Sequence, residues 1–190
     1  MWQNSQSHPK YCAPKFLCYN IFMTSANIKL RKIRRADLKY FLKWWRDKEL
    51  IKLTSGITEK STKLLAGYFL DLLNNGKDRH YLILLHHKAI GHLAIMHKNK
   101  DLFEINIVIG EKEYWGKGYG ELAIKQALRL AFGRLKYKKA YLEVRPDNKR
   151  AIMAYEKCGF VKNGIKKYPR NKYQPVVFKM VLSSQNKPIV

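Results

Sequence analysis

Apolar positions in the first part of the chain switch between the spacing of strands and that of helices. Residues 27–33 alternate apolar and basic side chains, which is typical of an edge strand. Two helical stripes follow, with apolar residues three and four positions apart. These stripes are Leu38, Phe41, Leu42 and Trp45, and then Leu64, Leu65, Tyr68, Phe69 and Leu72. Thr58 is expected to cap the second helix, and the sequence Asn74-Asn75-Gly76 to end it.

Short apolar runs bounded by turn residues predict six further strands. They lie at residues 81–85, 89–96, 102–109, 140–144, 160–165 and 175–182. Two helices separate the later strands. The first has an apolar side made by Leu122, Ala123, Gln126, Ala127, Leu130 and Ala131. The second begins at Asn148 and ends at Lys157, and Gly159 stands where a left-handed residue commonly ends a helix.

The predicted order of elements, β-α-α-β-β-β-α-β-α-β-β, describes an α/β protein with α+β layering. We expect a mixed, mostly antiparallel, twisted sheet of about seven strands, flanked by about four helices. The two later helices are expected to connect neighbouring strands. A chain of 190 residues suits one domain. We assign residues 25–184 to this domain, residues 1–24 to a poorly ordered tail and residues 185–190 to a C-terminal tail.

Charge is the unusual feature of the composition. The chain has 38 Lys and Arg against 14 Asp and Glu, a formal net charge of +24. Such a field favours polyanions, namely nucleic acid, anionic lipid or phosphorylated small molecules. The alternative is a compositional bias that spreads lysines over the surface without a specific partner.

Cysteine usage and hydropathy indicate the compartment. Three cysteines, of which Cys12 and Cys18 lie in the predicted tail, give no disulfide framework and favour a reducing environment. No apolar run is long enough for a transmembrane helix, so no membrane insertion is expected. The apolar segment at residues 16–23 lacks a basic start and does not fit a signal peptide. We expect a cytoplasmic protein, either a monomer or a homodimer.

The densest chemical signal is the loop Tyr114-Trp115-Gly116-Lys117-Gly118-Tyr119-Gly120, which follows a strand and opens a helix. Glycines let the backbone approach a ligand closely, and the free amides of a first helical turn attract anions. The loop therefore favours a pyrophosphate ligand, to which Lys117 can add charge. Its glycine spacing fits neither the dinucleotide fingerprint nor the phosphate loop of nucleotide triphosphatases. A glycine-rich turn without a ligand remains the alternative.

This segment resembles motif A of the GNAT acetyltransferases, which reads Gln or Arg, two variable residues, Gly, one variable residue, and Gly or Ala. Gly118 and Gly120 match its last fixed positions, whereas Trp115 stands where Gln or Arg is usual. The sequence Trp-Gly-Lys-Gly-Tyr resembles that of the GNAT branch that acetylates ribosomal-protein N-termini and small amines. A second segment resembles motif B of the family through Asn148, Ala151, Tyr155 and Cys158-Gly159-Phe160. The resemblance covers about residues 27 to 183.

The resemblance implies an acetyl-CoA-dependent N-acetyltransferase, an acyltransferase with acetyl-CoA as cosubstrate. In the GNAT fold the sheet splays between strands four and five, here 102–109 and 140–145, and the pantetheine arm lies between them. Backbone amides of the glycine loop would hold the pyrophosphate. The implied cofactor-binding residues are Val108, Ile109, Gly110, Trp115, Gly116, Lys117, Gly118, Tyr119, Gly120, Glu121, Asn148, Ala151 and Tyr155.

Two residues are candidates for catalysis. Tyr155 matches the family tyrosine that donates a proton or hydrogen bond to the leaving thiolate; its alternative role is packing against Phe160. Glu104 is the candidate base, because strand alternation sets it on one face with Asn106. An exposed strand residue or an ion pair is the alternative for Glu104. The histidines show no metal-binding spacing, so no metal is expected.

In the family the first two helices and the last hairpin form the acceptor pocket. The corresponding residues are Trp44, Trp45, Glu49, Glu59 and the loop 168–173. The small number of acidic residues disfavours polyamine and aminoglycoside acceptors. We therefore expect a protein N-terminus, such as that of a ribosomal protein, with contact to the ribosome or another polyanion. A small amine such as a nucleotide-linked amino sugar or an aminoglycoside is one alternative, and a non-catalytic nucleic-acid-binding module on the same scaffold is another.

Overall fold

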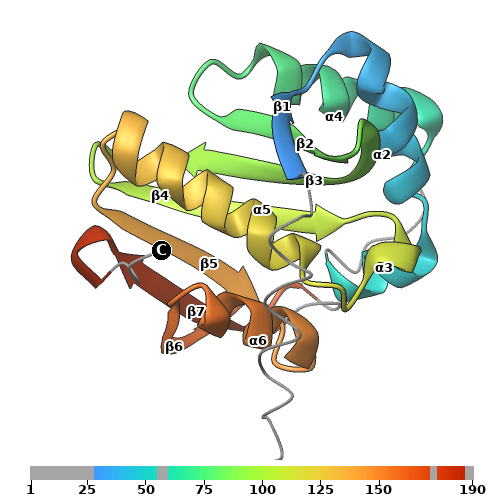
Figure 1. Cartoon of the computed structure of the whole chain (residues 1–190). Helices are drawn as coiled ribbons and strands as arrows, with labels where there is room; N and C mark the ends of the chain where they lie inside the picture. Colours follow the sequence, from blue (N-terminus) through green and yellow to red (C-terminus); the bar gives the residue numbers. More distant parts are fainter. Residues whose placement is uncertain (1–27, 55–59, 172–174, 187–190) are drawn as a thin grey trace, which may run out of the picture.

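A computed structural model describes residues 28–54, 60–171 and 175–186 (Figure 1). The strands are β1 (Ile28–Lys32), β2 (Arg79–Leu85), β3 (Lys88–His97), β4 (Leu102–Ile109), β5 (Lys139–Val144), β6 (Val161–Lys167) and β7 (Val176–Ser183). The α-helices are α2 (Leu38–Trp44), α3 (Lys48–Leu53), α4 (Thr62–Asn74), α5 (Tyr119–Leu128) and α6 (Lys149–Lys157). Short turns of other helix types are η1 (Arg35–Asp37), η2 (Lys112–Tyr114), η3 (Arg129–Arg134) and η4 (Ser184–Asn186).

The seven strands form one sheet in the order β1-β2-β3-β4-β5-β7-β6. Only β4 and β5 run parallel, and every other pair is antiparallel. The predicted mixed, mostly antiparallel sheet is therefore confirmed. Helix α5 connects the neighbouring strands β4 and β5, as expected. Helix α6 does not connect neighbours: it joins β5 to β6, and β7 lies between them. The sequence could not reveal this insertion, because β7 comes last along the chain.

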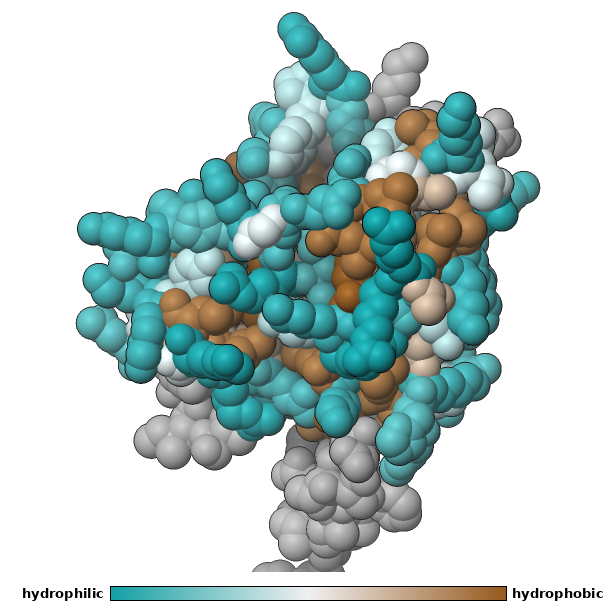
Figure 2. All heavy atoms as spheres, turned by 90° about the horizontal axis from the view of Figure 1, so that it is seen from above, coloured by the Kyte–Doolittle hydropathy of each residue, from teal (hydrophilic) through white to brown (hydrophobic). Residues whose placement is uncertain are grey.

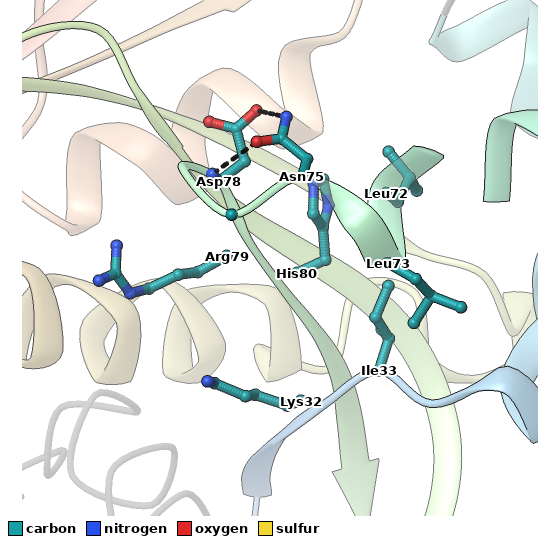
Figure 3. Close-up of a pocket in the computed structure, with 9 residues that line it drawn as sticks. Lys32, Ile33, Leu72, Leu73, Asn75, Asp78, Arg79 and His80 are labelled. Atoms are coloured by element: carbon teal, nitrogen blue, oxygen red, sulfur yellow. Dashed lines mark hydrogen bonds between the residues drawn. The ribbon is translucent and has the colours of Figure 1, made fainter. Parts of the chain in front are cut away.

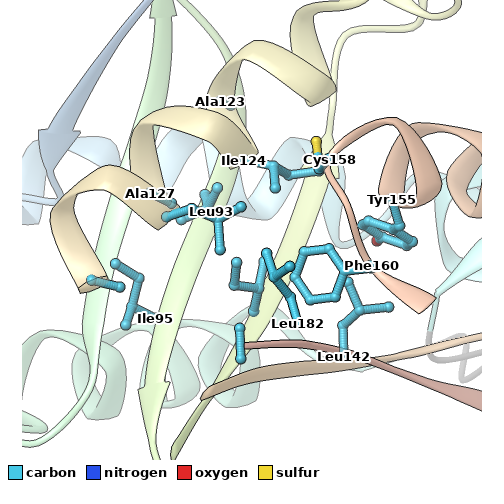
Figure 4. Packing of buried hydrophobic residues seen from close by; sticks show 14 of the residues in the cluster. Leu93, Ile95, Ala123, Ile124, Ala127, Leu142, Tyr155, Cys158, Phe160 and Leu182 are labelled. Atoms are coloured by element: carbon cyan, nitrogen blue, oxygen red, sulfur yellow. The ribbon is translucent and has the colours of Figure 1, made fainter. Parts of the chain in front are cut away.

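Helices cover the two faces of the sheet unequally (Figure 1). On one face, α5 and α6 pack on a large core that includes Leu93, Ile105 and Leu142 (Figure 4). On the other face, α2, α3 and α4 pack on a second cluster around Phe41 and Leu82. This second cluster contains no residue of β5, β6 or β7. The second face is thus covered mainly over β2 and β3.

Local sequence explains most element boundaries. His86 and His87 both have positive φ, as a two-residue turn between twisted antiparallel strands requires, and they join β2 to β3. The Ser61 hydroxyl caps α4 by accepting a hydrogen bond from the amide of Leu64. This replaces the predicted cap, Thr58, which lies outside the described residues. Gly159 has a φ of 88° and follows α6, as predicted.

Helix α3 was not predicted. It has six residues, too few for a periodic apolar stripe, and it depends on its cap. The Asp47 carboxylate accepts hydrogen bonds from the amides of Glu49 and Leu50. Of the predicted C-terminal tail, residues 185–186 belong to η4, and its other residues lie outside the described part of the chain, as do residues 1–24.

Polar residues dominate the face seen in Figure 2, where apolar residues form separate patches. Across the residues that the structure describes, no helix combines the length and the hydropathy needed to cross a membrane.

Candidate active site

The sheet opens between its two parallel strands. β4 and β5 pair only through Leu102–Lys139, Phe103–Ala140 and Glu104–Tyr141. β4 continues for five more residues and β5 for three, without pairing with each other. The β4 backbone groups that point toward β5 along this stretch therefore face no neighbouring strand, although such groups require hydrogen-bond partners. They form an edge suited to an extended polar ligand.

Strand alternation decides which β4 residues present this edge. The amide of Gly110 donates to the carbonyl of Ile90, so the backbone groups of Gly110 and Val108 face β3. Those of Ile107 and Ile109 consequently face β5. Of the three backbone positions predicted here, only Ile109 faces the edge, and Ile107, which the sequence analysis missed, joins it. The direction of these backbone groups follows from the register between β3 and β4. The sequence pattern of β4 alone does not contain that register.

The side chain of Trp115 uses part of this edge. Its indole N–H donates to the carbonyl oxygen of Ile109 at 2.7 Å, which ties the glycine loop to the end of β4. The guanidinium of Arg150, in the first turn of α6, lies 4.0 Å from the centre of the Trp115 ring. Burial lowers the pKa of Arg150 from its usual value. Arg150 was not among the predicted residues. Its contact with the Trp115 ring, together with the hydrogen bond from Trp115 to Ile109, links α6, the glycine loop and the end of β4.

The glycine loop leads into α5 through two left-handed glycines. Gly116 and Gly118 have φ values of 74° and 79°, in the left-handed region that glycine adopts without cost. Gly118 is the N-cap of α5, and the first bond of the helix runs from the amide of Leu122 to its carbonyl. The amides of Tyr119, Gly120 and Glu121 therefore have no acceptor within the helix. Together with the helix dipole they can hold a phosphate. Lys117 is exposed beside them.

Helix α6 begins beside the same opening. The Oδ1 atom of Asn148 accepts a hydrogen bond from the amide of Ala151 at 3.2 Å and so caps the helix. The Nδ2 group of Asn148, which is a donor, remains available for the predicted ligand contact. Ala151 contributes its small side chain to the core and its amide to this cap.

Tyr155 is buried on the inner side of α6, with 8% of its surface exposed (Figure 4). Its ring packs edge to face against Phe160 at 6.2 Å between ring centres. Burial, and secondarily the neighbouring Cys158, raise the pKa of the Tyr155 phenol, so it stays protonated at neutral pH. The hydroxyl forms no hydrogen bond with any described residue. A neutral buried phenol of this kind can donate a hydrogen bond to a ligand that enters the opening.

Glu104 lies at the point where β4 and β5 separate. As predicted, its side chain is on the face opposite Phe103 and Ile105, which are buried under α5. Its Oε2 atom accepts hydrogen bonds from Lys98 at 2.7 Å and from the Tyr141 hydroxyl at 2.9 Å. The ion pair with Glu104 raises the pKa of Lys98. Glu104 thus forms the ion pair that was the alternative to a catalytic role. To act as a base, the same carboxylate would have to accept the amine proton while it contacts Lys98 and Tyr141.

The residues predicted to form the acceptor pocket differ in their surroundings. Trp44 is buried against Gly110, where it leaves no room for a Cβ atom, and its indole N–H donates to Glu111 at 3.0 Å. It supports the end of β4. Glu49 is exposed and pairs with Lys112 at 2.8 Å. Glu59 and residues 172–173 of the last hairpin lie outside the described residues.

A separate cavity of about 280 Å³ lies at the other end of the strands (Figure 3). It is lined by Lys32, Ile33, Leu72, Leu73, Asn75, Gly76, Asp78, Arg79 and His80. His80 is buried there and its Nδ1 lies 3.2 Å from the Nε2 of His92. Because β2 begins at this cavity and ends beside the glycine loop, the cavity is not part of the opening.

Within the described part of the chain, no group of three His, Cys, Asp or Glu residues could hold a metal ion.

The family can now be identified from this arrangement. The sheet opens at a parallel pair, and a left-handed glycine loop starts a helix there. The family model of the acetyltransferase (GNAT) domain matches residues 27–161. The chain belongs to this family. The cosubstrate of GNAT enzymes is acetyl-CoA, and the unpaired β4 edge with the free amides of α5 fits an elongated ligand that carries phosphates.

Curated relatives match this GNAT domain over part of their length. The spermidine N(1)-acetyltransferase of Vibrio cholerae is 41% identical over 61 residues, which are 32% of this chain and 35% of the relative. An uncharacterized protein of Methanocaldococcus jannaschii is 28% identical over 140 residues, 72% of this chain and 28% of that protein. The matched segments thus span about a third of the length of these relatives.

Solved structures share the fold of this GNAT domain. Spermidine N-acetyltransferase from Vibrio cholerae, in complex with CoA and spermine, has a TM-score of 0.75 at 24% identity, covering 84% of this chain and 96% of that one. The aminoglycoside acetyltransferase AAC(6')-Ib in complex with coenzyme A has a TM-score of 0.73 at 20% identity, covering 84% and 96%. At these identities the likeness is one of fold.

Proposed function

We propose that this chain is an N-acetyltransferase that transfers the acetyl group of acetyl-CoA to a primary amine of a small molecule. One arrangement carries the proposal: the unpaired edge of β4 leads from Glu104 directly to the free amides of the glycine loop. Five residues of extended strand span roughly 16 Å. The edge thus connects a phosphate-binding helix start with a carboxylate at the point where the strands separate.

The thioester of acetyl-CoA supplies an activated acyl group, so the chain's residues mainly position the reactants and move protons. The amides of Tyr119, Gly120 and Glu121 hold the phosphates, and the backbone of Ile107 and Ile109 orients the arm. In the transfer, the amine nitrogen bonds to the acetyl carbon while the carbon–sulfur bond breaks. Glu104 receives the amine proton, directly or through water, and Tyr155 donates its proton or a hydrogen bond to the departing sulfur.

A small amine is favoured over a protein N-terminus as the acceptor. Two of the similar proteins named above are, by their names, acetyltransferases of spermidine and of aminoglycosides. Neither name mentions a ribosomal-protein acceptor, which the sequence Trp-Gly-Lys-Gly-Tyr suggested. Trp115 has instead a local role, because its indole N–H holds the loop against Ile109.

The test is acetylation of a panel of amines by the full chain with acetyl-CoA. Thiol release and mass spectrometry of the acetylated amine report the reaction. We expect at least one small primary amine to be acetylated in proportion to thiol release. If no amine is acetylated while acetyl-CoA still stabilises the fold against heat, the chain is a non-catalytic module and the proposal is wrong.

Glu104→Gln tests the base. We expect kcat/KM to fall by about 10-fold to 100-fold near neutral pH, in the range of a positioned base. The deficit should shrink at high pH, because a growing fraction of the amine is then already deprotonated. Asp101→Asn is the matched control, since it removes a carboxylate paired with Lys138 just before the start of β4. A deficit in Glu104→Gln that stays constant with pH would assign Glu104 to packing or to acceptor binding.

A further inference from the structure

Carboxylates of this chain are already paired with its own cations. Among the Asp and Glu side chains in the described ranges, all but Asp71 and Asp78 form an ion pair with Lys or Arg. This includes Glu104, at the opening of the sheet, and Glu111, which pairs with Lys43 at 2.6 Å. A polycationic acceptor would have to displace these lysines from the carboxylates. The site therefore disfavours a polyamine.

Lys179 lies on the same face of the sheet as Tyr141 and Glu143 and lacks such a carboxylate. It belongs to β7 and is the register partner of Glu143 on β5. The carboxylate of Glu143, however, is taken by Lys166 at 2.9 Å and by the Tyr168 hydroxyl at 2.6 Å. Lys179 forms no ion pair with any carboxylate that the structure describes. Its side chain is half-buried, so its ammonium group is held close to the sheet.

The position of this ammonium group is next to the proposed reaction centre. The Nζ atom of Lys179 lies 5.1 Å from the centre of the Tyr141 ring, and that of Lys98 lies 5.9 Å from the same centre. The Tyr141 hydroxyl in turn donates to Glu104, at the last pair between β4 and β5. Two ammonium groups thus converge on one tyrosine ring, and one of them has no counter-charge. An anion beside Tyr141 would be attracted by both.

We propose that Lys179, assisted by Lys98, binds an anionic group of the acceptor, so that the acceptor is a small amine bearing a phosphate or a carboxylate. The proposal rests on the proposed function and names its substrate class. An acceptor held between Glu104 and Lys179 has its amine and its anionic group separated by about one tyrosine side chain. The net charge of +24 adds a long-range attraction for the same class of molecule.

Matched pairs of amines test the proposal with the full chain and saturating acetyl-CoA. Each pair shares one amine and differs by the anion: glucosamine against glucosamine 6-phosphate, ethanolamine against phosphoethanolamine, and butylamine against 4-aminobutyrate. Spermidine is the polycationic comparison. We expect kcat/KM to be at least about tenfold higher for the anionic member of the best pair, and higher than for spermidine. The phosphate and carboxylate pairs distinguish the two anions. The preference should weaken between roughly 50 and 200 mM salt.

Lys179→Gln should remove the preference, and Lys179→Arg should keep most of it. Lys29→Gln, on the opposite edge of the sheet, removes the same charge and should leave the ratio unchanged. Equal or better use of the amines without an anionic group or of spermidine, or an unchanged ratio in Lys179→Gln, overturns the proposal.

Binding gives a readout that does not depend on turnover. Calorimetric titration of the coenzyme A complex with glucosamine 6-phosphate, phosphoethanolamine and 4-aminobutyrate should give a Kd for at least one of them that rises at least about fivefold in Lys179→Gln. Absence of binding by all three overturns the proposal. If one of them binds and no amine is acetylated, the proposed function alone fails.

Discussion

Gly118→Asp is expected to abolish binding of acetyl-CoA while the fold survives. Gly118 has a φ of 79° and caps α5, so an aspartate there points a negative charge toward the amides that hold the phosphates. With acetyl-CoA at about 100 times its Kd, the wild-type chain should gain about 2.7 kcal/mol of stability, and the variant none. The measurement is thermal unfolding with and without acetyl-CoA.

Two control variants separate charge from strain. Gly118→Asn has the same shape and tolerates a left-handed φ, but carries no charge, so it should retain part of the stabilisation. Gly120→Ala adds a Cβ atom that would lie 3.8 Å from Ile109, an ordinary contact, and should bind normally. Undiminished stabilisation by acetyl-CoA in Gly118→Asp would mean that the loop does not hold the phosphates.

Tyr155→Phe is expected to lower kcat by about 10-fold to 1000-fold, the usual contribution of a positioned acid. Affinity for acetyl-CoA should barely change, because the ring and its contact with Phe160 remain. Stability should change little, since Tyr155 is 8% exposed and its hydroxyl forms no hydrogen bond with any described residue. Single-turnover acetyl transfer is the measurement, because it isolates the chemical step.

Tyr137→Phe is the matched control for Tyr155. Tyr137 is equally buried, but its hydroxyl lies 2.7 Å from Nδ1 of His97, away from the glycine loop. Its loss should cost about 1 kcal/mol of stability and leave kcat unchanged. If Tyr155→Phe instead loses stability and keeps its single-turnover rate, Tyr155 serves only in packing.

Short-range patterns predicted the elements of this chain well where a residue acts through its neighbours in sequence. The left-handed glycine loop, the cap formed by Asn148 and the left-handed Gly159 after α6 all follow from contacts within a few residues. Helix α3 was missed because its six residues depend on the Asp47 cap and on burial of Leu50 in the second cluster. The crossing of α6 over β7 was also missed, since strand order is set by packing of the whole sheet.

The sequence by itself determined the family signals, the glycine loop that opens α5 and the two candidate catalytic side chains. Periodicity and glycine placement are local properties, and so the sequence contains them directly. Only the tertiary structure decided which groups meet. It set the β3–β4 register that directs Ile107 and Ile109 to the opening, and it paired Glu104 with Lys98 and Tyr141. It also left Lys179 without a carboxylate, because Glu143 accepts hydrogen bonds from Lys166 and Tyr168 instead. These contacts join residues far apart in the chain, and a charge finds its partner only when the sheet brings the strands together.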